Sequence, residues 1–251
     1  YFLKRGVTLT PEGENLYARI SSAAVQIQDA EEVLSASASL SHGAISISAT
    51  ETALNIYLSE RLRGFHAQYP GIRLRITNHS TLQAVQAVKN GEIDFAVVTT
   101  PAETGSDLKR VALMPFNEIL VGGPSFAELA GRTLALQALT AYPLIMLENG
   151  SMSRIFYRQF FLEHNAELKP DIEAGTTDQM LTLVRSDLGL AFVPEPMARG
   201  NLHRKRILQM NLQETIPSRS VCLVYDPHRP LNTAAREFRH QLLESAKNKQ
   251  K

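Results

Sequence analysis

The sequence Asn-Gly-Glu-Ile-Asp-Phe-Ala-Val-Val at residues 90–98 ends one helix and begins an almost wholly apolar strand. The Asn-Gly pair is a helix stop, and the apolar run that follows it is typical of a strand buried on both faces of a parallel sheet. A second run of this kind, Leu-Ala-Phe-Val at residues 190–193, is cut by Pro194. The two runs lie far apart in the chain, so we expect two α/β units, each with its own buried sheet.

Strand and helix patterns alternate around both runs. Further strands are predicted at 45–47, 72–76, 119–121, 144–147, 172 and 221–225. Helices are predicted at 54–65, 82–88, 155–163, 180–184 and 234–243. In the last helix Phe238 and Leu242 should face inward. Two unequal units and one trailing helix predict two lobes, with the chain crossing between them more than once.

A paired helix is predicted before the first lobe. Its apolar residues recur at spacings of 4, 3, 4, 3 and 4, the pattern of a coiled-coil seam. They are Leu16, Ile20, Ala23, Ile27, Ala30 and Leu34. Thr10 can cap this helix and Pro11 suits its first position. The helix should end in a hinge near residues 38–41, where small polar residues replace the seam. We therefore expect this helix to form a dimer.

The composition is that of an ordinary soluble globular protein, with 44% hydrophobic residues, 20% charged residues and a net charge of +1. The single cysteine, Cys222, cannot form an internal disulfide, which fits a reducing compartment. No apolar run approaches the roughly 18 residues of a membrane span, and no signal peptide is evident. These features predict a cytoplasmic protein. Because the chain starts at Tyr1 and not at Met, it is expected to be a piece of a larger protein.

Five segments, in order and at plausible spacing, resemble the LysR-type transcriptional regulators. They are residues 7–14, similar to the end of the winged helix-turn-helix; 43–47, similar to the first effector-domain strand; Phe65 with 69–72, similar to a helix-to-strand turn; 90–97; and 188–194. The resemblance implies an α/β fold: a two-lobed, periplasmic-binding-protein-like effector domain preceded by a long coiled-coil linker helix. One departure is Asp187, where the family pattern often has glycine.

The resemblance also implies a division of the chain. The expected parts are a winged-helix remnant at 1–10, a dimerisation linker helix at 11–40, lobe I at 43–116 plus 228–246, and lobe II at 117–227. The recognition helix is absent, so this chain alone should not read DNA sequence. In the intact protein Lys4 and Arg5 could contact DNA phosphates at the promoter. The assembly implied is a homodimer or homotetramer.

In open α/β lobes, ligands collect where strands end and the following helices begin, because free N–H groups and the helix dipole lie there. Hydroxyl-rich segments follow five of the predicted strands. The residues expected to contact an effector are Thr50, Glu51, Thr52, Ser80, Thr81, Thr100, Ser151, Met152, Thr176 and Pro194. The alternative for each Ser or Thr is a simple N-cap. Glu51 is expected either to bind a hydroxyl or an amine of the ligand or only to stabilise the start of a helix. The ligand expected is a small polar or anionic metabolite, and no cofactor is implied.

Other features favour structural roles. The seven histidines have no metal-ligand spacing, His79 fits a surface loop, Arg154 fits a solvated face, and Cys222 fits a buried thiol. No nucleophile with a partner and no phosphate-binding loop is found, so an enzyme is not expected. A transport-type solute-binding protein with the same two lobes remains the alternative, although it would need export and would have no use for a coiled-coil helix.

Overall fold

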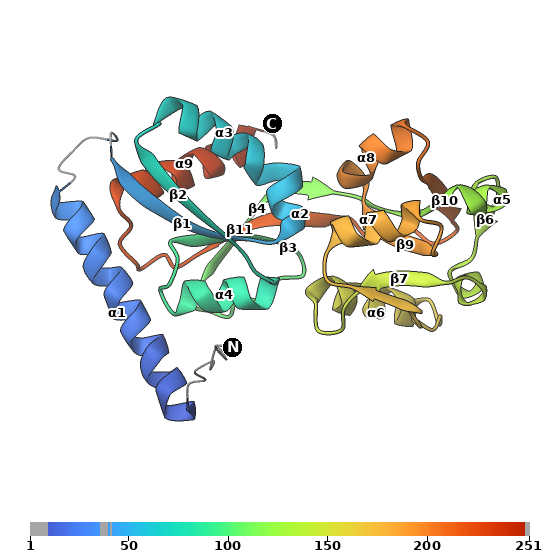
Figure 1. Ribbon diagram of the computed structural model, residues 1–251, viewed down its shortest axis with the longest axis horizontal. Coiled ribbons are helices and arrows are strands. Elements are labelled where there is room, and N and C mark those ends of the chain that lie inside the picture. The colour runs from blue at the N-terminus through green and yellow to red at the C-terminus, as the bar shows by residue number, and fades with distance from the viewer. Residues whose placement is uncertain (1–9, 36–39, 41, 249–251) are drawn as a thin grey trace, which may run out of the picture.

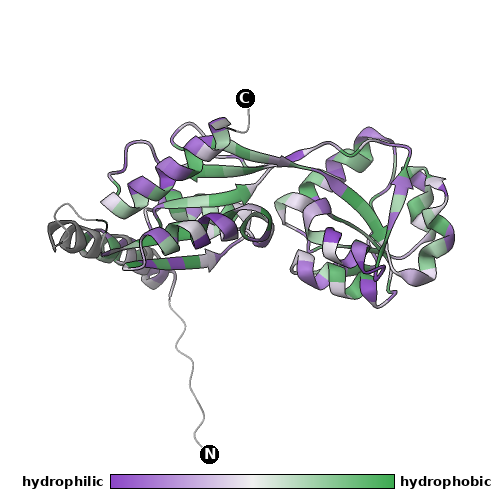
Figure 2. Cartoon of the chain, turned by 90° about the horizontal axis from the view of Figure 1, so that it is seen from above, coloured by the Kyte–Doolittle hydropathy of each residue, from purple (hydrophilic) through white to green (hydrophobic). Residues whose placement is uncertain are grey.

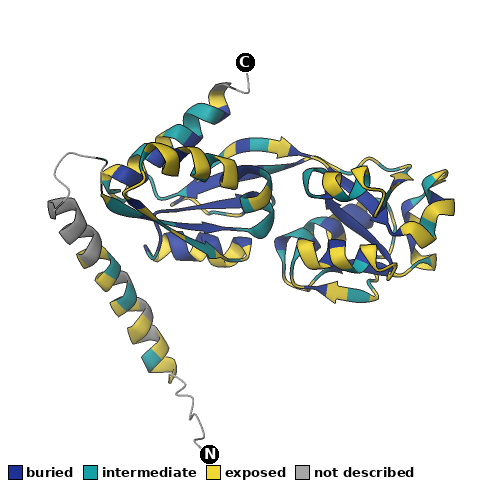
Figure 3. Ribbon diagram, turned by 45° about the horizontal axis from the view of Figure 1, so that its top comes forward, coloured by how far each residue is buried: buried dark blue, intermediate teal, exposed yellow. Residues whose placement is uncertain are grey.

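The computed structural model describes residues 10–35, 40 and 42–248. Two lobes lie side by side along the longest axis, and helix α1 (Pro11–Ser35) extends away from them (Figures 1 and 3). Apolar residues gather on the strands inside each lobe, and polar residues lie on the outer helix surfaces (Figure 2). No helix among the described residues is both long enough and apolar enough to cross a membrane.

Lobe I is built on a five-stranded sheet in the order β2-β1-β3-β11-β4. Its strands are β1 (Gly43–Ala49), β2 (Ile72–Asn78), β3 (Phe95–Thr99), β4 (Lys109–Phe116) and β11 (Arg219–Tyr225). β1 pairs in parallel with β2 and β3, whereas β11 runs antiparallel to β3 and β4. All five residues of β3 are buried, as its apolar run predicts, although the sheet is mixed and not purely parallel.

Helices cover both faces of this sheet. One face packs against α9 (Thr233–Asn248) and a continuous helix made of α2 (Glu51–Ala53), the π-helical η1 (Leu54–Leu58) and α3 (Ser59–Gln68). The other face packs against α4 (Thr81–Lys89). Phe95 and Val97 point to the first face, and Ala96 and Val98 to the second. Phe238 of α9 is fully buried with its ring centroid 4.7 Å from that of Phe65.

Lobe II has a six-stranded sheet in the order β6-β10-β5-β9-β7-β8. Its strands are β5 (Glu118–Gly122), β6 (Thr133–Leu134), β7 (Leu144–Leu147), β8 (Ile172–Ala174), β9 (Leu190–Pro194) and β10 (Leu208–Leu212). Its helical segments are η2 (Pro124–Phe126), α5 (Ala127–Ala130), η3 (Leu136–Ala141), α6 (Met152–Glu163), α7 (Thr177–Arg185) and α8 (Glu195–His203). α6 packs on one face of the sheet, and α7 and α8 pack on the other.

The expected division of the chain needs one correction. The resemblance predicts that residues 117–227 form lobe II, but β11 within that range pairs with β3 and β4 in lobe I. The chain therefore crosses to lobe II between β4 and β5 and returns between β10 and β11. Strands β4, β6 and β10 were not expected from the sequence. β4 is partly exposed and contains Pro115, so it lacks the continuous apolar run that marks a buried strand.

Helix α1 begins as the sequence predicts, with Thr10 Oγ1 accepting a hydrogen bond from Gly13 N at 3.1 Å. Of the seam, Leu16, Ile20 and Ile27 are 58%, 56% and 61% exposed, and Ala23 is also exposed. The side chains of Ala30 and Leu34, the residues Lys4 and Arg5, and most of the hinge at 38–41 lie outside the described residues. The single chain thus carries an apolar stripe that its own lobes do not cover.

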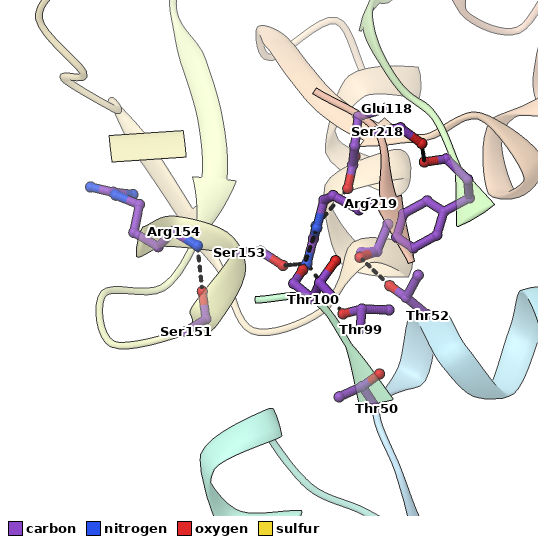
Figure 4. A network of polar contacts seen from close by, with 12 residues as sticks. Thr50, Thr52, Thr99, Thr100, Glu118, Ser151, Ser153, Arg154, Ser218 and Arg219 are labelled. Carbon is purple, nitrogen blue, oxygen red and sulfur yellow. Dashed lines mark hydrogen bonds and ion pairs between the residues drawn. The ribbon is translucent and has the colours of Figure 1, made fainter. Parts of the chain in front are cut away.

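A buried arginine joins the two lobes at the crossing (Figure 4). Arg219, at the start of β11, donates from Nη1 to Glu118 Oε1 at 2.6 Å, and both side chains are almost fully buried. Its Nε donates to the carbonyl oxygen of Thr100 at 2.6 Å. Its Nη2 donates to Thr99 Oγ1 at 3.2 Å and to Ser153 Oγ at 3.0 Å. Glu118 and Ser153, the latter in the first turn of α6, belong to lobe II, whereas Arg219 belongs to lobe I. This one guanidinium therefore holds the two lobes together.

Removal of this guanidinium should strongly destabilise the protein. Arg219→Met leaves the Glu118 carboxylate buried without its partner, which typically costs about 3–5 kcal/mol. The matched control is Arg199→Met, because Arg199 pairs with Glu195 at 3.3 Å on an exposed helix surface and such pairs contribute about 0–1 kcal/mol. Urea unfolding followed by circular dichroism measures both. Equal losses in the two variants would contradict the role assigned to Arg219.

Candidate functional site

A cavity of about 260 Å³ lies between the lobes. Lobe I supplies the ends of β1, β2 and β3 and the starts of α2 and α4, and lobe II supplies the corresponding junctions after β7 and β8. The lining residues are Thr50, Glu51, Thr52, Asn78, His79, Ser80, Thr81, Gln83, Thr99, Leu147, Glu148, Ser151, Met152, Ser153, Gly175, Thr176 and Thr177. The volume is below the roughly 300–1,000 Å³ of sites for drug-sized molecules. The cavity therefore suits a small, polar compound.

Eight of the ten residues expected from the sequence lie on this cavity. They are Thr50, Glu51, Thr52, Ser80, Thr81, Ser151, Met152 and Thr176. The other two do not reach it. Pro194 lines a much smaller space of about 10 Å³ beside Arg219, and Thr100 Oγ1 instead accepts a hydrogen bond from Ser220 N at 2.9 Å.

Four of the hydroxyls also cap helices, the alternative that the sequence left open. Thr50 Oγ1 accepts from Ala53 N at 3.4 Å, Ser151 Oγ from Arg154 N at 3.1 Å, and Thr176 Oγ1 from Gln179 N at 3.2 Å. Ser80 forms a capping box with Gln83. A capping hydroxyl accepts through its oxygen and keeps its own O–H as a donor. Capping and ligand contact are therefore compatible at each of these positions.

Several lining residues were not predicted from the sequence, and the interpretation of Arg154 was wrong. His79 lies in the loop between β2 and α4, as the sequence predicts, and is half-buried there with Nδ1 at 3.1 Å from Ser48 Oγ. Arg154 is only 8% exposed, so it is not on a solvated face. Its guanidinium turns away from the cavity to the carbonyl oxygen of Leu147 at 3.2 Å and to Glu173 at 3.4 Å (Figure 4). Asn78 and Ser153 lie within the strand-end segments that the sequence indicates but were not among the residues chosen from them, and Glu148 directly precedes one of these segments.

Glu51 spans the cleft. Its Oε2 accepts a hydrogen bond from Thr177 N at 2.7 Å and its Oε1 accepts from Asp178 N at 3.4 Å, both in the first turn of α7. Beside this contact, the hydroxyls of Thr52 and Thr177 lie 3.5 Å apart. Burial raises the pKa of Glu51 above its ordinary value of 4.5, and repulsion from Asp178 adds to the rise, while the bond from Thr177 N opposes it. The first turn of α7 thus receives a carboxylate from the protein itself.

Two carboxyl side chains, Glu51 and Glu148, line the cavity, whereas none of its described lining residues is a lysine or an arginine. The imidazole of His79 also lines it, with Nδ1 at 3.1 Å from Ser48 Oγ. Two guanidiniums near the cavity bind other carboxylates, Arg219 that of Glu118 and Arg154 that of Glu173. Within the described chain, no three His, Cys, Asp or Glu side chains are arranged to hold a metal ion. Cys222 is buried, which raises the pKa of its thiol, so it is a poor nucleophile.

Solved structures share this fold. The effector-binding domain of QuiR in complex with shikimate superposes with a TM-score of 0.72 at 20% identity, covering 83% of this chain and 99% of that one. Full-length CbnR complexed with its target DNA has a TM-score of 0.73 at 18% identity, covering 96% of this chain and 85% of that one. In both cases the likeness extends over both lobes.

Sequence comparison identifies the family. Residues 38–247 match the family described as LysR substrate binding domain. The HTH-type transcriptional regulator YofA of Bacillus velezensis is 26% identical over 238 residues, which cover 95% of this chain and 80% of that protein. These relatives do not favour a transport-type solute-binding protein. The chain belongs to the LysR family and carries the effector-binding domain of a LysR-type transcriptional regulator.

Proposed function

We propose that the cavity between the lobes is the effector site and that it binds a small polar metabolite without transforming it. The observation that supports this most strongly is the meeting of four strand-to-helix junctions and the end of β3, from both lobes, around one cavity. Each junction brings hydroxyls and first-turn N–H groups, which bind polar oxygens. The shikimate named in the QuiR complex is a ligand of this size and polarity.

The effector acts by shifting the balance between lobe arrangements. Thr50 and Ser80 belong to lobe I, while Ser151 and Thr176 belong to lobe II. A ligand that contacts all four is bound best in one relative position of the lobes, so its binding energy favours that position. In the intact protein this change alters the angle between the DNA-binding domains on the promoter. Lys4 and Arg5 contribute contacts to DNA phosphates there. This function places the protein in the cytoplasm.

The linker helix α1 makes the protein a dimer, and a tetramer can form through further contacts. The support is the stripe of Leu16, Ile20 and Ile27, which is apolar, more than half exposed and spaced as a coiled-coil seam. Pairing buries this stripe against the same stripe of a second copy. Effector binding then affects the two DNA-binding domains of the dimer together.

Filling the cavity should abolish effector binding. Asn78 is exposed at the cavity, so Asn78→Trp places a large ring there without entering a core. Thermal-shift measurements with hydroxy acids, amino acids, polyols and sugar phosphates should find a compound that stabilises the wild type, by about 2.7 kcal/mol at about 100 times Kd. The same compound should not stabilise Asn78→Trp.

The control is Asn211→Trp on the exposed side of β10, which should respond as the wild type does. A compound that stabilises both variants equally would place binding outside the cavity. A panel that stabilises no form of the protein would contradict the proposed function.

Charges on the stripe of α1 should separate the subunits. In Leu16→Glu/Ile20→Glu/Ile27→Glu, three like charges would face three more across the seam, so the dimer should dissociate. Light scattering coupled to size exclusion measures the mass directly. Gln26→Glu, at an exposed position off the stripe, serves as the control and should stay dimeric. A wild type of monomer mass would contradict the proposed pairing.

A further inference from the structure

We propose that the effector carries an amino group and that Glu51 is the side chain that recognises it. The effector is then a small zwitterion of the α-amino acid type, with its ammonium at Glu51 and its carboxylate at the first turns of α4 and α6. This inference rests on the proposed function, because it assigns the chemistry of the same cavity.

The side chains that line the cavity favour a ligand with a positive group. Glu51 and Glu148 supply carboxyl groups, and none of the described lining residues is a lysine or an arginine. The one imidazole among them, His79, already contacts Ser48 Oγ through Nδ1 at 3.1 Å. Arg219 and Arg154 lie nearby but each already binds a carboxylate. A dianion such as a phosphate ester would find no lysine or arginine among these residues and would be repelled by Glu51. A ligand with a positive group would instead be attracted by Glu51.

Glu51 lies where it can bind this positive group. It is half-buried between the lobes, whereas Glu148 is exposed at the rim. Thr177 N and Asp178 N each donate one hydrogen bond to it, but the two oxygens of a carboxylate together accept about four. Acceptor capacity therefore remains beside the cavity. Partial burial and the nearby Asp178 both disfavour the negative charge of Glu51, as its raised pKa indicates. An ammonium offsets both effects through its charge and its hydrogen bonds, whereas a neutral hydroxyl supplies a hydrogen bond without the charge.

The remaining helix starts complete the recognition. The first turn of α7 is occupied by Glu51 itself, so a ligand carboxylate is directed to the other first turns on the cavity. These are the first turns of α4, whose N-cap is Ser80, and of α6, whose N-cap is Ser151. Their hydroxyls can donate to a carboxylate, and the helix dipoles favour a single negative charge there. A ligand with one positive and one negative group thus finds a carboxyl group and two helix N-termini on the same cavity of about 260 Å³.

The test compares matched ligands on residues 1–251. Calorimetry is run with the proteinogenic L-amino acids, with their 2-hydroxy acid analogues, in which a hydroxyl replaces the amino group, and with phosphoglycolate as a phosphate probe. A charge-assisted hydrogen bond corresponds to roughly 10- to 100-fold in affinity. We expect one or more amino acids to bind at least about tenfold more tightly than their hydroxy analogues.

Variants separate recognition from folding. Glu51→Gln keeps an oxygen that can accept from Thr177 N, and it should reduce the preference for the amino acid by about tenfold while still binding the hydroxy analogue. Glu148→Gln, at the exposed rim, should keep the preference. If hydroxy acids or phosphoglycolate bind as well as amino acids and Glu51→Gln changes nothing, the amino-group inference is overturned while the effector site stands. If no probe binds the wild type, the effector site itself is contradicted.

Discussion

The arrangement of the two lobes depends on the buried guanidinium of Arg219. A charge with 4% of its side chain exposed is tolerable only when its donors meet acceptors, and here one carboxylate, one carbonyl and two hydroxyls meet them. The planar fork of arginine allows this, because its donors point in several fixed directions at once. A lysine at this position could not reach Glu118 and Ser153 with the same geometry. The contact to Ser153 fixes the start of α6, and with it the side of the cavity that faces Thr50.

The sequence was informative wherever one local pattern determines the structure. The apolar run of β3 predicted a strand buried on both faces, and the hydroxyl-rich strand ends predicted eight of the seventeen described residues that line the cavity. It was uninformative where the answer depends on a distant partner. Residues 221–225 read correctly as a strand, but only pairing with β3 and β4 places that strand in lobe I. Thr100 was misjudged for the same reason, since its hydroxyl oxygen accepts a hydrogen bond from Ser220 N of that strand.

Asp187 shows how a departure from the family pattern is accommodated. Its φ of +59° lies in the left-handed region, where glycine is favoured and aspartate is tolerated better than most residues. The side chain then acts in a way that glycine cannot, because its Oδ1 accepts from both the amide and the hydroxyl of Ser125 at 2.8 Å. The short helix η2, which precedes α5, is thereby hydrogen-bonded to the turn that follows α7. The geometry that the family pattern requires is kept, and a tertiary contact is added.

The contacts between the lobes are unequal, and this inequality bears on signalling. The Arg219 cluster is almost fully buried and lies where the chain crosses, so separating the lobes there would break the buried ion pair between Arg219 and Glu118. The contact of Glu51 with α7 is half-buried, borders the cavity, and consists of two hydrogen bonds that water can replace. A change in lobe angle therefore costs least if it pivots about Arg219 and exchanges the contacts of Glu51. Glu51 is also the side chain that we propose to bind the effector, and it belongs to the inter-lobe contact that breaks most easily.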